Sequence, residues 1–412
     1  EIGVRLVGSE MCIRDRDDAV TRILTLKENK GILDWKESNY SLEKALATVG
    51  SDENRAKERE IATKAVTVVK NENNTLPLNV TKKSKVLMLC PYTNEQSQML
   101  MGWNRAKKAG LIPDGAEVKV QCFMNHDDLE TVKENIDWAD TVIINSEIYG
   151  TYYTNYKHWL SAGPNNFTKY CKENNKTSVI MSVDLPYDVQ LYPYADAILA
   201  VYGDIGSAVD PTEAIVGGTT TSKEAYGPNI IAGVEVALGT FGATGTLPVN
   251  VTKYDANSNS YTDEIVYKRG YGITYDAKTI NRDELENKVA ELEKLEKGNY
   301  TDASWSVFEI ALNDAKEVLG KVSSQEDIDE ALATLNKAYE ALTENKKEEP
   351  TNPSDKKDES TNKKDETVKT ETKKNTQKSK VKTGDNTAIT AFAVMMFISA
   401  VSYTHLTLPT IA

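Results

Sequence analysis

Five short apolar segments, separated by stretches with helical periodicity, constrain the fold of this chain most strongly. A run that is apolar at consecutive positions is typical of a strand buried on both faces of a sheet that helices cover. The segments are 86–90 (VLMLC), 118–122 (VKVQC), 141–145 (TVIIN), 178–183 (SVIMSV) and 197–202 (AILAVY). Helical patterns lie between and after them at 94–109, 129–136, 164–173 and 229–238. This alternation predicts a three-layer α/β sandwich with a mostly parallel sheet.

Helical patterns also lie on both sides of this predicted sandwich. Residues 18–33 and 53–69 read as two helices, with Gly31 as the stop of the first. After a polar stretch to about residue 279, residues 282–343 carry three further helical patterns with short breaks between them. This arrangement predicts an antiparallel three-helix bundle, whose third helix begins at Ser324.

Charge and ligand inventory exclude several classes of function. The chain has 49 Lys and Arg against 62 Asp and Glu, a net charge of -13, so nucleic acid is not an expected partner. Three His and four Cys occur without C-x-x-C or H-x-x-x-H spacing, and no glycine-rich phosphate-binding loop follows a predicted strand. We therefore expect neither a metal nor a cofactor, and we expect Cys90, Cys122 and Cys171 to be buried and unpaired.

The carboxyl-terminal part changes composition abruptly. Residues 346–382 are almost entirely polar and charged, which predicts a disordered linker. Residues 388–400 are apolar, but shorter than the roughly 20 residues that cross a bilayer. A buried helix is one reading, and a truncated membrane segment is the one we favour, with 383–400 as a sorting and anchor segment. The preceding VKTGD resembles a sortase signal, although it lacks the Leu and Pro of L-P-x-T-G.

Both ends carry stretches that resemble translated sequencing-adapter read-through. These are EIGVRLVGSEMCIRDR at 1–16 and VSYTHLTLPTIA from residue 401 to 412; a native strand and tail are the alternative reading. The chain begins with Glu1 and shows no charged region followed by an apolar one, so we expect no signal peptide within it. We expect the remainder to be an internal or carboxyl-terminal piece of a longer protein.

Several segments between residues 17 and 275 together resemble the carboxyl-terminal part of glycoside hydrolase family 3. They are RILTLKENKGI (22–32), REIATKAVTVVKNENNTLPL (59–78), SVDLPYDVQLYPYADAILAVYG (182–203), NIIAGVEVALGTFGATGTLPVNV (229–251) and RGYGITY (269–275). The resemblance implies that 17–58 are linker helices following a (β/α)8 barrel. It also implies that 59–280 are the α/β sandwich domain of that family.

This resemblance implies a retaining exo-β-glycosidase whose Asp nucleophile lies on the barrel, which this chain does not contain. In the β-N-acetylglucosaminidase branch, which the wording of 184–203 and 226–239 favours, a barrel-loop His is the acid/base. This chain would then be inactive alone. In the β-glucosidase branch a sandwich-domain Glu takes that role, and Glu147 is the candidate because it follows a predicted strand. Tyr149, Tyr152 and Trp159 are candidate substrate-binding residues, with Tyr153 on the same surface, although aromatic loops can also simply close a core. We interpret His158, Asp184 and Asp188 as structural residues.

The predicted bundle, within 281–345, resembles the FIVAR module of Gram-positive surface proteins. NYTDASWSVFEIALNDAKEVL (299–319) and SSQEDIDEALATLNKAYEAL (323–342) carry this resemblance. It implies a spacer or carbohydrate-binding role at a cell surface, with Trp305 in the core. We expect the parent to be extracellular, anchored to the wall or membrane of a Gram-positive bacterium, and to act on a β-linked glycan. The alternative is a non-enzymatic surface protein that binds glycan.

Overall fold

A computed structural model of the chain describes residues 2–34, 36, 41–203 and 227–346, and the side chains only from residue 13 onward. The chain divides into two units, Glu1–Lys346 and Lys347–Ala412, and the second lies outside the described residues. The predicted linker at 346–382, the anchor segment at 383–400 and the tail at 401–412 therefore fall, apart from Lys346, in a part that is not described.

A six-stranded sheet forms the centre of the domain, with the strand order β1-β6-β5-β4-β2-β3. All neighbouring strands are parallel except β1 and β6, which are antiparallel. The strands are β1 (Thr67–Asn71), β2 (Lys85–Cys90), β3 (Glu117–Cys122), β4 (Thr141–Ser146), β5 (Thr177–Ser182) and β6 (Ala197–Ala200). The predicted mostly parallel sheet is confirmed.

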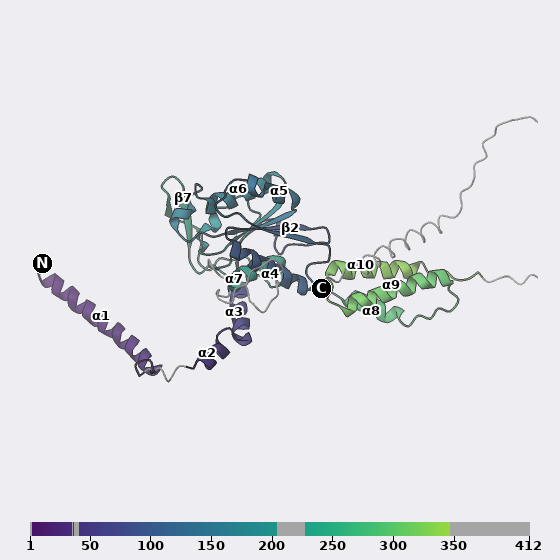
Figure 1. The fold of residues 1–412 in the computed structure, drawn as a ribbon, viewed down its shortest axis with the longest axis horizontal. Helices are drawn as coiled ribbons and strands as arrows, with labels where there is room; N and C mark the ends of the chain where they lie inside the picture. Colours follow the sequence, from purple (N-terminus) through teal and green to yellow (C-terminus); the bar gives the residue numbers. More distant parts are fainter. Residues whose placement is uncertain (1, 35, 37–40, 204–226, 347–412) are drawn as a thin grey trace, which may run out of the picture. The chain divides into compact units, whose positions relative to one another are not determined.

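Helices cover both faces of this sheet (Figure 1). On one face, α4 (Thr93–Lys108) and α7 (Pro228–Leu238) pack on side chains such as Ile143. On the other, α5 (Glu130–Trp138) and α6 (Trp159–Glu173) pack on Val142 and Ile144. Because side chains of a strand alternate between faces, consecutive apolar residues fill both cores. The result is the three-layer sandwich that the sequence predicts.

The segments at the two ends of the sheet differ from their prediction. β3 is an edge strand whose residues are exposed or half-buried, because one of its sides has no neighbouring strand. The helix predicted over 53–69 ends earlier: α3 spans Asp52–Ala65, and the β-branched run that follows it forms β1. Thr67 and Val68 pair with β6, and this pairing favours a strand over a continued helix.

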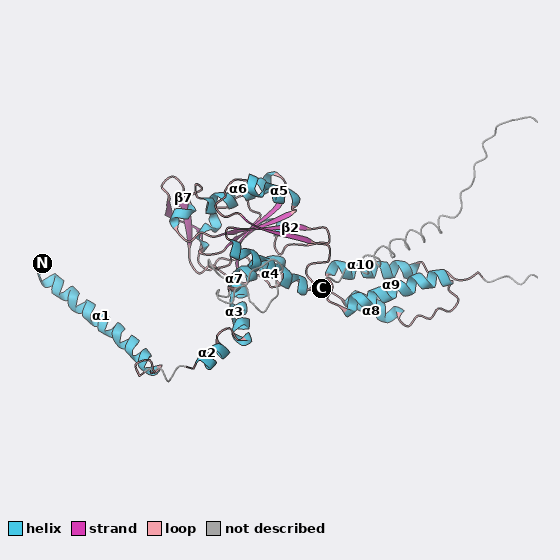
Figure 2. Cartoon of the chain, in the orientation of Figure 1, coloured by secondary structure: helices cyan, strands magenta, loops and turns pink. Residues whose placement is uncertain are grey.

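The polar stretch before residue 279 contains a hairpin that the sequence analysis missed. It consists of β7 (Val251–Asp255) and β8 (Ser260–Tyr267), which pair antiparallel. Figure 2 shows strands of the central sheet and of this hairpin in one colour. β8 is mostly exposed, so its sequence lacks the apolar run that marked the sheet strands.

The segments before and after this hairpin form backbone hydrogen bonds with each other and with the chain at β1. Backbone hydrogen bonds run from Gly245 N to Val66 O (3.2 Å), from Ile273 N to Val68 O (2.8 Å) and from Leu247 N to Tyr271 O (2.9 Å). A Cβ on Gly245 would collide with the backbone oxygens of Ala65 and Val66. Three of the segments that carry the family resemblance, 59–78, 229–251 and 269–275, thus pack together at β1. We call them the landmark segments.

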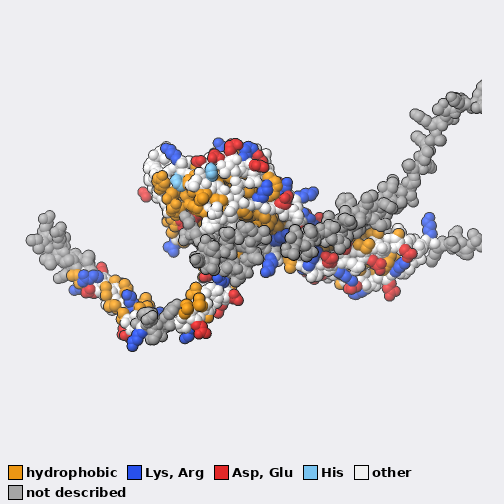
Figure 3. Space-filling model, in the orientation of Figure 1, with side chains coloured by type: hydrophobic (Ala, Val, Ile, Leu, Met, Phe, Trp, Pro, Cys, Tyr) orange, Lys and Arg blue, Asp and Glu red, His pale blue; other side chains and the backbone are white. Residues whose placement is uncertain are grey.

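Three helices precede the sheet. α1 spans Ile2–Asn29, α2 spans Leu42–Thr48, and Ser41 and Ser51 cap the helices that follow them. The helix predicted from residue 18 therefore begins sixteen residues earlier, at Ile2, while Gly31 (φ 66°) follows its end as predicted. Figure 3 shows hydrophobic side chains along this part of the surface. Ile23, Leu26 and Leu46 are among the exposed hydrophobic residues of these helices.

The predicted three-helix bundle is confirmed. It comprises α8 (Asp283–Leu292), α9 (Asp302–Gly320) and α10 (Gln325–Glu340), packed around Leu285, Phe308 and Leu335. Ser324 caps α10, and Asp327 completes a capping box with it. Trp305 packs against this core, as expected. Among the helices of the described residues, none combines the length and apolar character needed to cross a membrane.

Candidate functional site

The carboxyl ends of β2 and β4 bring the predicted site residues to one edge of the sheet. β4 ends at Ser146, and Glu147 follows it directly. β2 ends at Cys90, and the chain then enters α4 through Tyr92, the residue that precedes the helix. Ligand sites of parallel α/β sheets lie beyond these strand ends.

Glu147 is fully buried and faces a second carboxyl group, that of Glu95 in the first turn of α4. The two side chains hydrogen-bond to each other, and the amide of Asn145 donates to Glu95 Oε2 at 2.6 Å. Burial raises the pKa of Glu95 to about 7, although the hydrogen bonds from Glu147, Asn145 and Tyr92 lower it. Two carboxyl groups in contact need a proton between them, so the pair is a buried acid.

Tyrosine side chains lie next to this pair. Tyr92, Tyr149 and Tyr153 are neighbours that affect one another's pKa, and the charge of Glu147 contributes to the raised pKa of Tyr92. The rings of Tyr149 and Tyr153 are 4.3 Å apart between centroids. Tyr149 is 40% exposed, so these tyrosines lead from the buried carboxyls toward solvent.

The other aromatic candidates continue the same surface. Tyr152 is 68% exposed and contacts Tyr153 and His158, with ring centroids 5.2 and 5.6 Å apart. Trp159 is half-buried and meets Tyr92 edge to face at 5.9 Å. His158 precedes α6, and its Nδ1 accepts a hydrogen bond from Leu160 N at 3.3 Å. The structure therefore brings all the predicted aromatic residues together beside Glu147.

Asp188 lies in a separate buried network. It accepts hydrogen bonds from the hydroxyls of Ser146, at 2.5 Å, and of Ser182, and Tyr192 also contacts Ser146. Burial raises the pKa of Asp188 to about 7. All four side chains are inaccessible, as expected of a carboxyl that holds loops together.

Glu95 is the site residue that sequence reasoning missed. An acidic residue in the first turn of a helix is ordinary, because it interacts favourably with the helix dipole. The sequence indicates that Glu95 lies near the start of a helix, three residues after Tyr92. Its contact with Glu147, however, depends on how β2 and β4 pair. Within the described residues, no group of three or more His, Cys, Asp and Glu side chains could hold a metal ion.

The buried pair predicts a specific pH dependence of stability. The folded protein retains the Glu95 proton up to about pH 7, whereas the unfolded chain releases it near the ordinary value of 4.5. The wild type therefore loses stability as pH rises through this window. We expect Glu95→Gln to gain on the order of 2 kcal/mol relative to wild type between pH 5 and pH 8, measured by urea denaturation.

A matched control for this experiment is Glu134→Gln, which changes an exposed glutamate on α5. Its stability relative to wild type should change little over the same pH range. A Glu95→Gln variant whose difference from wild type stays constant between pH 5 and pH 8 would show that the buried pair does not hold a proton.

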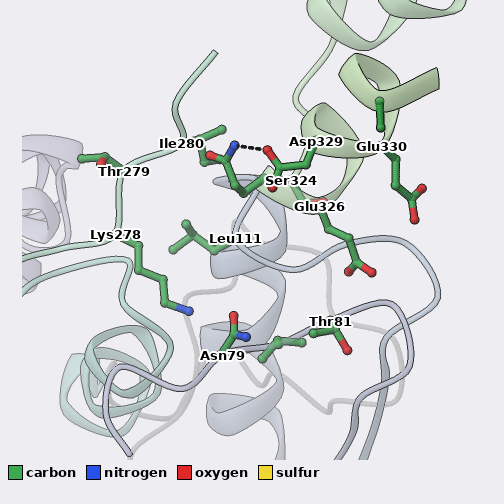
Figure 4. A pocket seen from close by; sticks show the side chains of 14 residues that line it. Asn79, Thr81, Leu111, Lys278, Thr279, Ile280, Ser324, Glu326, Asp329 and Glu330 are labelled. Atoms are coloured by element: carbon green, nitrogen blue, oxygen red, sulfur yellow. Dashed lines mark hydrogen bonds between the residues drawn. The ribbon is translucent and has the colours of Figure 1, made fainter. Parts of the chain in front are cut away.

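A cavity of about 690 Å³ lies elsewhere, between the sandwich and α10 (Figure 4). Lys278, Leu111 and Asn79 line it from the sandwich, and Glu326 and Asp329 line it from α10. Several of its polar groups already have partners. Lys278 donates to Leu78 O, Glu326 accepts from Lys82 N at 2.7 Å, and Gln325 donates to Asp329 at 2.8 Å. None of the predicted site residues lines this cavity. We therefore interpret it as a gap where the sandwich and α10 meet, and not as the candidate site.

Comparison with known proteins finds matches to two parts of the chain. Residues 281–343 match the FIVAR domain. A stretch of 80 residues is 36% identical to a beta-xylosidase from Formosa agariphila, and it covers 19% of this chain and 11% of that protein.

A search of solved structures returns matches that include two glycosidases. A β-glucosidase from Listeria innocua, in complex with gluconolactone, shares 18% identity over 63% of this chain, with a TM-score of 0.37. A glycoside hydrolase family 3 β-N-acetylglucosaminidase from Paenibacillus sp. shares 16% identity over 56% of this chain, also with a TM-score of 0.37. The matched region spans 38% of each of those chains.

Proposed function

We propose that this chain is the carboxyl-terminal part of a retaining exo-β-glycosidase of the kind found in glycoside hydrolase family 3. The observation that carries the proposal is the way three landmark segments of that resemblance pack into one unit at β1. Gly245 and Gly272 lie within these segments, where a side chain would collide with backbone atoms. The 36% identity to a beta-xylosidase over 80 residues supports the same class of enzyme.

Within this class, we favour hydrolysis of β-N-acetylglucosaminides, with the nucleophile and the acid/base on a barrel domain of the parent protein. The burial of Glu147 supports this assignment, because in this structure its carboxyl has no exposed surface from which to reach a leaving group. The exposed Tyr149 and Tyr152 would then contribute a stacking surface for sugar. The same surface would serve a protein that binds glycan without cleaving it.

A chromogenic assay tests the proposal. The purified chain and the full-length parent are each given the aryl β-N-acetylglucosaminide, β-glucoside and β-xyloside. We expect no turnover by the chain alone, and we expect the parent to prefer the acetylated sugar, because the chemistry lies on the barrel. Glu147→Gln in the parent should retain most of its activity.

The alternatives give different results in the same assay. Glucoside preference together with a loss of at least about 100-fold in Glu147→Gln would assign the acid/base to this chain. Turnover by the chain alone would overturn the claim that it is inactive. A parent that cleaves none of the three substrates, yet binds immobilised glycan through Tyr152, would favour the binding protein.

We further propose that the parent is held on the outside of a Gram-positive cell. The FIVAR match at 281–343, the polar linker and the apolar segment at 388–400 support this proposal. The three-helix module would contact cell-wall carbohydrate, and nucleic acid is not a proposed partner. Fractionation of the source bacterium tests the location. Sequencing the locus across residues 16 and 401 tests whether both end segments are adapter sequence.

A further inference from the structure

Two cysteines meet at the candidate-site edge of the sheet. Cys90 is the last residue of β2 and Cys122 the last of β3, and they are direct partners in the parallel register. The Cys90 thiol donates to Gln121 O at 3.7 Å, and the Cys122 thiol donates to Pro91 O at 3.3 Å. Both side chains belong to the core on the α4 and α7 face of the sheet. The pair therefore points to one side, as a bridge between the strands requires.

The geometry suits a covalent bond between these two residues. Adjacent strands lie about 4.8 Å apart, which is within the roughly 4.4–6.8 Å between Cα atoms that disulfides span. Neither cysteine is oxidised in the structure, where Cys90, Cys122 and Cys171 are free thiols as expected. Cys171 is buried in the core on the opposite face of the sheet, so it does not compete for either partner.

The two thiols differ in access. Cys90 is fully buried, while Cys122 is half-buried on the edge strand, which is less buried than we expected for it. The neighbouring Cys90 thiol and the Met124 backbone lower the pKa of Cys122 to about 6. Burial raises the pKa of Cys90 and of Cys171. Of the three cysteines whose side chains the structure describes, Cys122 is thus the one that offers a reactive thiol to an external disulfide.

We propose that Cys90 and Cys122 form a thiol–disulfide exchange site for small disulfides such as oxidised glutathione. The Cys122 thiolate attacks one sulfur of the small disulfide, whose S–S bond breaks and releases one thiolate that takes up a proton. Cys90 loses its proton to solvent and attacks the Cys122 sulfur, which releases the second thiol. In total, two protein thiols are oxidised to one disulfide, and one small disulfide is reduced to two thiols.

This exchange acts directly on the buried carboxyl pair. The charge of Cys122 is one of the causes that raise the pKa of Glu95, and Glu95 and Glu147 in turn raise the pKa of Cys90. A neutral disulfide removes this charge. It also ties the edge strand β3 to β2, immediately before the chain enters α4 at Tyr92. The redox state of the pair therefore sets the electrostatics of the candidate site.

The test is an exchange equilibrium with counting of the remaining thiols. The full chain, in a Cys12→Ser background, is equilibrated without oxygen in buffers with increasing ratios of oxidised to reduced glutathione. The samples are quenched in acid, unfolded, alkylated and weighed by mass spectrometry. We expect two thiols to disappear together with the loss of two hydrogen atoms and no bound glutathione. Peptide mapping should link Cys90 to Cys122.

Three variants separate this outcome from other oxidation. Cys171→Ser should form the same disulfide as the Cys12→Ser background and leave no thiol that can be alkylated. Cys90→Ser should retain one glutathione on Cys122, because the resolving thiol is missing. Cys122→Ser should keep both remaining thiols reduced. The proposal is wrong if all three thiols of the background protein stay alkylatable at every ratio, or if it accumulates only the mixed disulfide.

Discussion

Gly245→Ala is expected to destabilise the α/β domain by at least about 3 kcal/mol. The added Cβ would lie far inside van der Waals contact of the Ala65 and Val66 carbonyl oxygens, and both are backbone atoms that no rotamer change can move. Relief would require the segment to separate from β1, and this would also break the hydrogen bond from Gly245 N to Val66 O. Urea denaturation of the full chain, followed by circular dichroism, measures the loss.

Gly320→Ala is the matched control for this change. Gly320 is the last residue of α9, and nothing lies within 4 Å of the position where its Cβ would stand. Alanine there should change stability by no more than about 1 kcal/mol, in the stabilising direction. If Gly245→Ala does not fold, its loss from the soluble fraction while Gly320→Ala is retained supports the argument. A Gly245→Ala variant within about 1 kcal/mol of wild type contradicts it.

Much of the fold was predictable because it depends on local patterns. A segment such as 141–145 is apolar at consecutive positions, which is typical of a strand that is buried between two cores. The bundle was equally readable from its helical period and the Ser324 start signal. The hairpin at β7 and β8 was not, because β8 is mostly exposed and most of its residues are polar. Strand β1 was missed because its valines also continue the period of the preceding helix.

The candidate site was only partly predictable, for a different reason. Glu147 could be placed at a strand end, and the aromatic residues after it could be expected nearby, because both follow from chain order. The contact of Glu147 with Glu95 and that of Cys90 with Cys122 arise from strand register. Register is decided by packing across the whole sheet, which the local pattern of a single segment does not specify. Whether Glu147 acts as an acid/base stays a prediction.

A buried carboxylate connects two of the same landmark segments, 59–78 and 229–251. Glu235, in the middle of α7, has no exposed surface and pairs with Arg59 of α3 and with Arg105 of α4, the latter at 3.7 Å. Arg59 also lies over the ring of Phe241, 5.0 Å from its centroid. One carboxylate thus ties three helices together on one face of the sheet. A buried ion pair contributes less net stability than its loss suggests, because breaking it leaves buried charges without a counterion.

Glu235→Ala is therefore expected to destabilise the domain by about 3–5 kcal/mol, since the mostly buried guanidinium of Arg105 loses this carboxylate. Glu235→Gln should lose less, because the amide oxygen can still accept a hydrogen bond from Arg59. The control is Glu60→Ala on α3, which removes an exposed carboxylate that pairs with Lys57 and Lys64. An exposed pair contributes at most about 1 kcal/mol. Equal losses in Glu235→Ala and Glu60→Ala, measured by urea denaturation, would mean that Glu235 does not hold α3, α4 and α7 together.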